Sequence, residues 1–367
     1  MPSHRSFRPA RPEPRRSLLG NLVLGLGAGL VAWRGEHRRA AGPAQADGTS
    51  VAPDGRGRTA ARPGQIPARG WQDILWRTWE EMQEDRLVSV AAGVTFYLLL
   101  ALVPGIAALV SIYGLFADPA TIRDHLNSLA GVLPGGAVDV VGEQIGRIAG
   151  QGRGTLGTAF VTSLLISLWS ANAGTKALFD ALNVAYDETE KRSFLRLTLV
   201  SLGCTLAAVA FLIVALAGVV VVPLVLDAVG LGTVAEAIIR VARWPLLLVI
   251  VAVALAALYR YGPSRDEPRW RWVSVGSAFA ALGWLVASLL FSWYAANFGS
   301  YNQTYGSLGA VVGFMTWMWI SCIVVLLGAE LNAETEHQTE RDTTDGPAKP
   351  LGARGARMAD TVGKPAS

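Results

Sequence analysis

The sequence predicts an all-α protein, a polytopic membrane bundle of six core transmembrane helices. Its 367 residues are 51% hydrophobic and only 16% charged, whereas an average soluble domain is about 25% charged. Long apolar runs also recur along the chain, and about 20 apolar residues in a helix span the hydrocarbon core of a bilayer. Because hydrocarbon offers no partner to an unpaired peptide group, each run must be helical. The expected spans are Leu87–Phe116, Leu156–Leu178, Leu195–Leu226, Trp244–Leu258, Trp272–Ala296 and Leu308–Leu331.

Residues 1–70 are predicted to be an N-terminal extension of the membrane domain, which covers residues 71–336. Within the extension, Ser17–Trp33 is an apolar segment that follows several arginines, as in a signal sequence or anchor. It is an extra crossing, a surface-lying segment, or the product of a wrongly chosen start codon. Arg34–Gly70 is rich in Ala, Gly, Pro and Arg, which predicts a disordered linker whose arginines contact anionic lipid headgroups. Residues 337–367 are polar and predict a disordered cytoplasmic tail.

The fourth predicted span is short and opens with a proline. Pro245 has a fixed φ and no N–H, which suits the first turn of a helix. Just before it, Thr233–Arg243 is amphipathic and is expected to lie at the membrane interface.

The charges of the loops predict the orientation, because Lys and Arg are retained on the cytoplasmic side. The second loop carries Lys191, Arg192 and Arg196, and the fourth loop carries four arginines between Arg260 and Arg271. Both ends of the six-helix core are therefore expected in the cytoplasm of a bacterium, with the helices in its inner membrane.

The end of the second span carries a stripe of polar side chains. At 100° per residue, one side of this helix collects Trp169, Asn172, Lys176, Asp180 and Asn183. Such residues normally face a bundle interior or a watery cavity, so the stripe is a candidate polar pathway in which Lys176 pairs with Asp180. Alternatively, Asp180 and Asn183 meet cytoplasmic water while Lys176 snorkels, and Trp169 and Asn172 make hydrogen bonds between helices.

Three further features are candidates for function. Pro104 is expected to kink the first span. Glu330, at the end of the last span, is either a counter-ion to Lys176 or to an arginine, or part of a solvated helix end. Uncharged polar residues before the last span form either an outer lip or a tight turn: Tyr301, Asn302, Thr304 and Tyr305.

Three segments together resemble the YihY/BrkB family of bacterial inner-membrane proteins. They are VAAGVTFYLLLALVPGIAALVSIYGL, LWSANAGTKALFDALNVAYDE and YNQTYGSLGAVVGFMTWMWISCIVVLLGAELNAE, and the resemblance covers about Gly70 to Glu336. It implies a six-helix membrane protein of a family that is linked in some bacteria with resistance to serum killing. Members have also been called ribonuclease BN, for the maturation of transfer RNA.

Enzymatic activity is not expected from the residues. A metal-dependent nuclease needs clustered His and Asp ligands, but His4, His37, His125 and His337 are scattered. The glycine-rich segment Gly150–Thr158 lacks the lysine of a phosphate-binding loop. The sequence therefore predicts no cofactor, no metal and no nucleic-acid partner, and it leaves the oligomeric state open. It favours a transporter, channel or lipid-handling protein over a structural envelope protein that uses its polar groups to join helices.

Overall fold

The computed structural model describes residues 55–113, 158–229, 233–298 and 307–366. All of them belong to one compact unit, Ala52–Ser367. The predicted apolar segment at residues 17–33, residues 117–155 between the first two predicted spans, and the outer-lip residues Tyr301, Asn302, Thr304 and Tyr305 lie outside the described residues.

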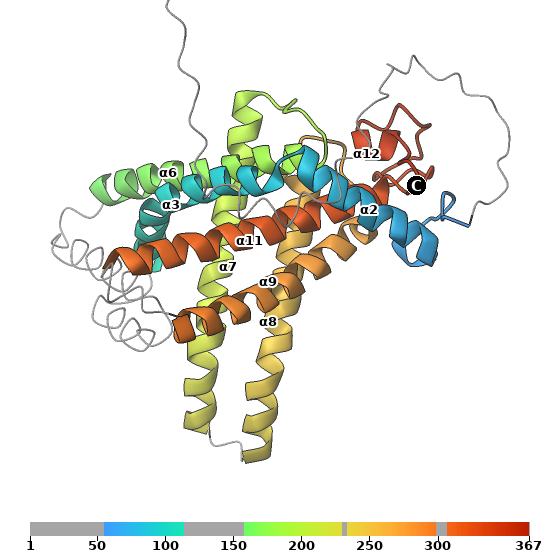
Figure 1. Ribbon diagram of the computed structural model, residues 1–367. Helices are drawn as coiled ribbons and strands as arrows, with labels where there is room; N and C mark the ends of the chain where they lie inside the picture. Colours follow the sequence, from blue (N-terminus) through green and yellow to red (C-terminus); the bar gives the residue numbers. More distant parts are fainter. Residues whose placement is uncertain (1–54, 114–157, 230–232, 299–306, 367) are drawn as a thin grey trace, which may run out of the picture. The chain divides into compact units, whose positions relative to one another are not determined.

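The described chain is helical, which confirms the all-α class. After a short 3-10 helix, η2 (Pro63–Gln65), the chain forms α2 (Ala68–Glu84) and α3 (Leu87–Tyr113). The other long helices are α6 (Thr158–Ala185), α7 (Phe194–Val229), α8 (Thr233–Tyr261), α9 (Trp270–Phe298) and α11 (Ser307–Glu336), and α12 (Arg357–Asp360) is a single turn (Figure 1). Each of the six predicted spans overlaps one of these long helices.

The described helices that are long and apolar enough to cross a membrane are fewer than the six predicted spans. Within the described residues, α7, α8, α9 and α11 are long and apolar enough to span a membrane, and α2 with the start of α3 qualifies as a pair bent by 63°. Helix α6 does not qualify, because its polar stripe lowers the hydropathy of its second half. Six crossings therefore stay a prediction.

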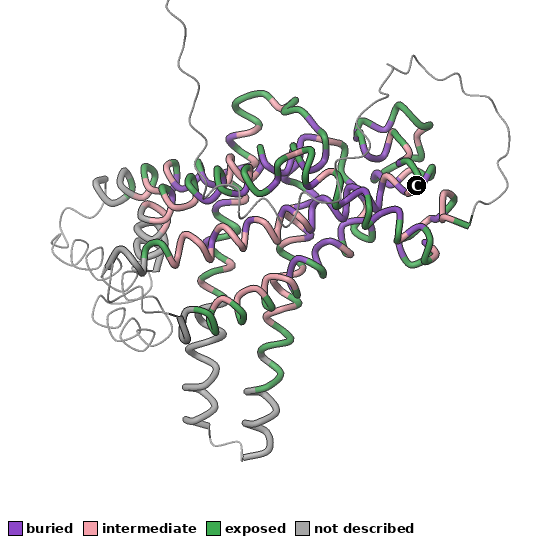
Figure 2. Tube along the Cα trace, in the orientation of Figure 1, coloured by how far each residue is buried: buried purple, intermediate pink, exposed green. Residues whose placement is uncertain are grey.

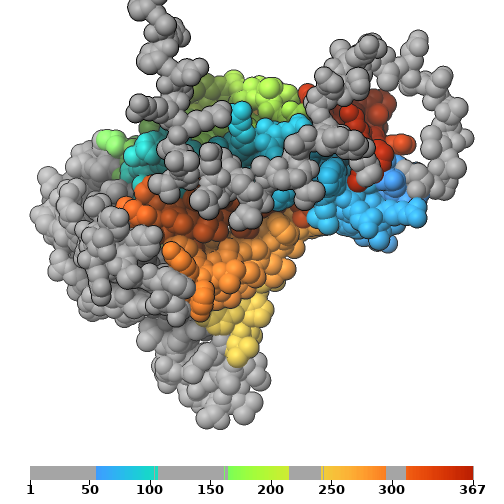
Figure 3. Space-filling view, viewed as in Figure 1, coloured from blue at the N-terminus to red at the C-terminus, as the bar shows by residue number. Residues whose placement is uncertain are grey.

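Helix α11 is the central element of the bundle. It contacts α2, α3, α6 and α9, and α3 packs along α6 (Figure 1). Figure 3 shows α3, α11 and α9 side by side on one face. Helices α3 and α6 run antiparallel, because Gly105 lies beside Ala171 whereas Leu98 and Ala101 lie beside Gly174.

Apolar side chains cover the outside of the long helices, as expected of a protein whose surroundings are lipid. On α7, Phe194, Leu195 and Leu199 are each more than 60% exposed, and Leu246 on α8 and Leu289 on α9 are similar. A soluble protein rarely exposes such continuous apolar surface, so the exposure supports the membrane assignment.

Helices α9 and α11 cross at two glycines. A Cβ on Gly276 would lie only 1.9 Å from the carbonyl oxygen of Gly328, so no other residue fits between the two backbones. Next to the crossing, Asn332 accepts a hydrogen bond from the Gly276 N–H at 2.7 Å. Small residues at helix contacts are the usual device for close approach in membranes.

The proline of the fourth span occupies a different place from the predicted one. Helix α8 starts at Thr233 and runs without interruption to Tyr261, so Pro245 lies inside the helix and not in its first turn. The prediction was wrong because the preceding amphipathic segment continues into the span. The missing N–H of Pro245 is tolerated in a long membrane helix, where neighbouring groups and local adjustments satisfy the freed carbonyl.

The C-terminal segment is packed, although its composition predicts disorder. Figure 2 shows buried residues gathered where α11 ends and the segment begins, and Gln338, Thr339 and Thr343 are fully buried. The Gln338 side-chain amide donates to the Arg56 carbonyl at 2.8 Å, and the Thr339 hydroxyl donates to the Ala60 carbonyl at 2.7 Å. Composition misses this order because polar contacts, rather than apolar burial, provide it.

The described end of the predicted N-terminal linker is also packed. Ala60 and Ile66 are buried against Ile74, Trp272 and Leu331. Residues 55–70 therefore form part of the folded unit, although their Pro, Gly and Arg content predicts a disordered linker.

Candidate functional site

The upper part of the polar stripe on α6 faces α7. Asn172 is buried, and its side-chain oxygen accepts a hydrogen bond from the Thr205 hydroxyl at 3.2 Å. Thr175 also bonds Thr205, at 2.8 Å. Of the two interpretations of Asn172, the structure supports hydrogen bonding between helices. Trp169 is 58% exposed, so it does not lie inside the bundle.

Lys176 makes different contacts from those predicted. No ion pair joins Lys176 to Asp180 in the described part of the chain; the Lys176 ammonium instead donates to the Thr198 hydroxyl at 3.0 Å. It also lies 5.6 Å from the ring centroid of Trp169 and 5.1 Å from that of Phe194. Aromatic faces within about 6 Å attract a cation, so these rings and Thr198 take the place that the carboxylate was expected to fill.

The lower part of the stripe divides into two environments. Asp180 is exposed, in agreement with the interpretation that the helix meets water there. Asn183 is buried instead, and its side-chain oxygen accepts a hydrogen bond from the Ser264 N–H at 2.7 Å. Asn183 therefore joins α6 to the loop that follows α8, and the expectation that it meets water is wrong.

Asn183 also contacts the loop between α6 and α7. Its amide donates to Glu190 at 3.3 Å, and the Arg192 guanidinium binds both carboxylate oxygens of Glu190, at 2.8 and 2.7 Å. Arg192 further donates to the Gly262 carbonyl at 2.8 Å. These contacts fix the loop against the end of α8.

The Glu190 contacts predict an acid-sensitive contribution to stability. The hydrogen bonds from Arg192 lower the pKa of Glu190 from 4.5 to about 2. Because the folded-state pKa is the lower one, the stabilisation is complete above about pH 4.5 and is lost as the pH falls toward 2. In a series of thermal melts in detergent, we expect Glu190→Gln to lose less stability over this interval than the unchanged protein. Glu340→Gln, at another exposed position, is the control, and an equal acid loss in both variants would contradict the assignment.

A groove lies between α3 and α6, beside the stripe. Its volume is about 450 Å³, within the range of small-molecule sites. Its wall is mostly small or apolar, and the polar groups are Tyr97, Lys176 and Asp180. The lining residues are Val90, Gly93, Val94, Tyr97, Ala173, Lys176, Ala177, Asp180, Ala181 and Val184.

The groove exists because the side chains between the two helices are small. A Cβ built on Gly93 has no heavy atom within 4 Å, and three alanines of α6 continue the open wall. The lining residues recur every three or four positions on each helix, which places them on one face of each. Lys176 and Asp180 are identifiable in the sequence by their polarity, but the groove is not, since small apolar residues carry no comparable signal.

Glu330 is buried, whereas Asp180 is exposed. Glu330 is 1% exposed, and neither carboxylate oxygen has a hydrogen-bond partner within the described structure. The prediction of a solvated helix end is therefore wrong, and no ion pair to Lys176 or an arginine is found for it in the described chain. One helical turn later, Glu334 pairs with Arg77 of α2, and both side chains are buried.

Pro104 lies inside α3, as the sequence predicts. The 63° bend recorded at this end of the bundle is at the junction of α2 and α3, where Arg86 has a φ of 50°. A kink at Pro104 itself stays a prediction.

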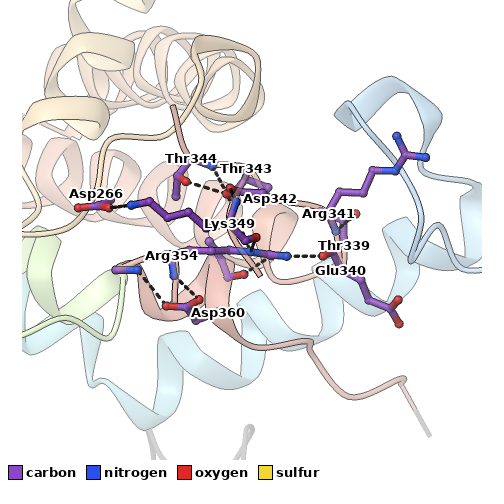
Figure 4. A network of polar contacts seen from close by, with 12 residues as sticks. Asp266, Thr339, Glu340, Arg341, Asp342, Thr343, Thr344, Lys349, Arg354 and Asp360 are labelled. Carbon is purple, nitrogen blue, oxygen red and sulfur yellow. Dashed lines mark hydrogen bonds and ion pairs between the residues drawn. The ribbon is translucent and has the colours of Figure 1, made fainter. Parts of the chain in front are cut away.

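A polar network that sequence analysis missed closes the α11 end of the unit (Figure 4). Arg354 donates to the carbonyls of Glu340 and Ala359, and Lys349 contacts Asp266 at 2.6 Å. Asp342 accepts hydrogen bonds from the Thr344 hydroxyl and the Lys349 N–H, both at 2.7 Å. Burial alone would raise the pKa of Asp342, but these hydrogen bonds outweigh burial and lower it. Lys349 and Asp266 lie 83 positions apart, and the other partners lie within 14 positions of each other in a segment with little regular secondary structure, so no helical or strand spacing predicts them.

A comparison with protein families matches most of the described chain to one family. The family described as virulence factor BrkB matches residues 78–352, which includes α3, α6 to α11 and most of the polar network. This chain belongs to the BrkB family. The match extends beyond Glu336, where the resemblance seen in the sequence ends, into the packed C-terminal segment.

Curated relatives of this BrkB-family chain have membrane or ribonuclease-like names. A putative ribonuclease-like protein of Bacillus subtilis is 30% identical over 67% of this chain and 88% of its own length. A UPF0761 membrane protein of Methylibium petroleiphilum is 26% identical over 72% of this chain, and the match spans 62% of that protein. A UPF0761 membrane protein of Neisseria meningitidis is 27% identical over 72% of this chain and 63% of its own length. No solved structure matches.

Proposed function

We propose that this BrkB-family membrane protein is a lipid-handling protein that binds an amphipathic ligand in the groove between α3 and α6. The observation that carries the proposal is the groove itself, with an apolar wall and with Lys176 and Asp180 one helical turn apart on its α6 side. An acyl chain fits the wall, which Val90, Val94 and Val184 help to form. A phosphate group fits the ammonium, which retains donors beyond the one given to Thr198.

The groove is open to the surroundings of the helices, which suits a ligand that enters from the bilayer. Tyr97, Ala173 and Asp180 are all exposed along it. A lipid tail that leaves the bilayer for this wall exchanges one apolar environment for another, so we expect the headgroup contacts to decide which lipid binds. In the proposed orientation the groove lies toward the cytoplasmic face of the bacterial inner membrane.

The proposal favours lipid handling over the other functions that the sequence leaves open. A continuous aqueous pathway along α6 has less support, because Asn172 and Asn183 are both occupied by hydrogen bonds to neighbouring segments. A purely structural envelope role would use the same hydrogen bonds and leave the groove without a ligand. The ribonuclease-like name belongs to the Bacillus protein, and the proposal contains no catalytic step.

The test fills the groove and leaves the rest of the chain unchanged. Gly93→Phe places an aromatic ring in the groove, and Gly203→Phe is the matched control, because a Cβ at Gly203 on α7 also has no heavy atom within 4 Å. A ligand present at 100 times its Kd stabilises a protein by about 2.7 kcal/mol. We therefore expect phosphatidylethanolamine or phosphatidylglycerol to raise the melting temperature of the purified protein and of Gly203→Phe, but not that of Gly93→Phe.

Two further variants assign the headgroup contacts. Lys176→Met should reduce stabilisation by both lipids, because both carry a phosphate group. Asp180→Asn should reduce stabilisation by phosphatidylethanolamine more strongly, since only that headgroup has an ammonium. Equal lipid stabilisation of Gly93→Phe and the unchanged protein would refute the groove as the site and leave the structural role as the better interpretation.

A further inference from the structure

The buried Glu330 is unusual among the acidic residues at the end of α11. Among the residues that the structure describes, no donor bonds its carboxylate oxygens, and the residue is 1% exposed. Glu334 and Glu336, on the same helix, are equally buried, but each is paired with an arginine. Burial of a charged carboxylate without a partner costs far more free energy than a protein domain can normally offset.

In the described parts of the chain, the charged groups found to act on Glu330 are acidic. The Asp85 side chain, at the junction of α2 and α3, lies against the Glu330 carboxyl. Glu81 of α2 and Glu334 of α11 add negative charge nearby, and Tyr186 at the end of α6 adds a buried phenol. Arg77, the buried cation close by on α2, is bound to Glu334 and Gln338.

Two facing carboxyl groups attract each other only when they hold a proton between them. A protonated carboxyl has an O–H that donates to the other carboxylate, whereas two ionised groups repel, and paired acids therefore share one proton. We propose that Asp85 and Glu330 together form a binding site for one proton. The proton comes from water when the site fills, and it returns to water when the site empties.

The proton site lies at the junction of α2 and α3, so its occupancy affects how these helices pack on α11. Asp85 lies where α2 and α3 meet at 63°, beside Arg86 with its φ of 50°, and α2 packs on α11. A bound proton holds the junction against α11, and its loss places two like charges face to face. Val90, at the end of the groove, is little more than one helical turn from the junction, so the occupancy of the site acts on the helix that forms the groove.

The experiment detects the proton itself, in the full chain and without any lipid ligand. Infrared difference spectra of the purified protein should show the C=O stretching band of a buried protonated carboxyl, with a shift in heavy water. The band should vanish in Glu330→Gln and change in frequency in Asp85→Asn, which removes the acceptor. Glu80→Gln, a matched change on the exposed face of α2, should leave it unchanged.

A pH series of thermal melts supplies a second measurement. The unchanged protein should lose melting temperature as the pH rises and the site empties, whereas Glu330→Gln, which is always neutral, should lose less over the same pH range. A spectrum without a protonated carboxyl band that responds to Glu330→Gln would overturn the proposal. Stabilisation that depends on added sodium or potassium rather than on pH would also overturn it, because the site would then hold a metal cation.

Discussion

Replacing Gly276 by alanine is expected to separate α9 from α11 and to cause one of the largest losses of stability available to a single methyl group in this protein. The new Cβ would lie 1.9 Å from the Gly328 carbonyl oxygen and 2.6 Å from Cγ of Asn332. The first of these neighbours is backbone, so the clash is relieved only when a whole helix moves. Overpacking of a well-packed contact typically costs about 1–3 kcal/mol of stability and occasionally more. We expect the cost of Gly276→Ala to lie at or above the upper end of this range.

The helix movement also breaks specific contacts at the crossing. The Gly276 N–H bonds Asn332 at 2.7 Å, and the Tyr259 hydroxyl donates to the Val325 carbonyl at 2.7 Å. Gly328→Ala should act in the same direction, since its Cβ would lie 2.6 Å from both the Gly276 carbonyl oxygen and the Tyr259 hydroxyl.

Gly313→Ala is the matched control for this prediction, because it changes the same helix as Gly328→Ala. A Cβ at Gly313 has no heavy atom within 4 Å, and alanine is preferred to glycine in a helix by about 1 kcal/mol. Gly313→Ala should therefore leave the melting temperature in detergent unchanged or raise it slightly. If Gly276→Ala, Gly328→Ala and Gly313→Ala had the same melting temperature, the close crossing of α9 and α11 would not contribute to stability.

The sequence predicts the helices well because lipid leaves so few alternatives. The first predicted span and α3 both begin at Leu87, and the third, Leu195–Leu226, lies within α7. An apolar run in a bilayer must be helical, and its length follows from the thickness of the hydrocarbon. Pro245 was misplaced, because hydropathy marks where an apolar run starts and not where a helix starts.

The sequence predicts which residues of the candidate site share a helix face, but not which residues that face contacts. Helical periodicity placed Lys176, Asp180 and Asn183 on one side of α6. Thr198, which bonds Lys176, and Ser264, which bonds Asn183, belong to other elements. A helical repeat predicts which side chains share a face and says nothing of what the face meets. The order of the C-terminal segment was missed in the same way, since its contacts join residues hundreds of positions apart.

Loss of the Arg265 guanidinium is the second change expected to destabilise the protein strongly. The side chains of Arg265 and Glu336 are 0% exposed, and the guanidinium reaches both carboxylate oxygens, at 2.6 and 3.2 Å. The guanidinium carbon also lies 4.2 Å from the ring centroid of Tyr186. Removal of one member of a buried ion pair leaves an uncompensated charge and costs about 3–5 kcal/mol, so Arg265→Ala should lower the melting temperature by many degrees.

The neighbouring Asp266 provides the control, because it forms an ion pair of the same type at the surface. Its partner Lys349 lies 2.6 Å away, and both side chains are about half exposed. Exposed pairs contribute little to stability because water screens them, so Lys349→Ala should melt almost like the unchanged protein. Equal losses for Lys349→Ala and Arg265→Ala would show that burial does not determine the importance of these pairs.

A double substitution separates the cost of the unpaired charge from the value of the pair itself. When both partners of a buried ion pair are replaced by apolar residues of similar volume, stability is often retained or raised. We therefore expect Arg265→Met with Glu336→Met to be more stable than Arg265→Met alone. The Thr343 hydroxyl, which donates to Glu336 at 2.8 Å, loses its acceptor in the double variant and limits the recovery. A double variant as unstable as the sum of the single ones would mean that Arg265 and Glu336 act independently, in conflict with the two hydrogen bonds that join them.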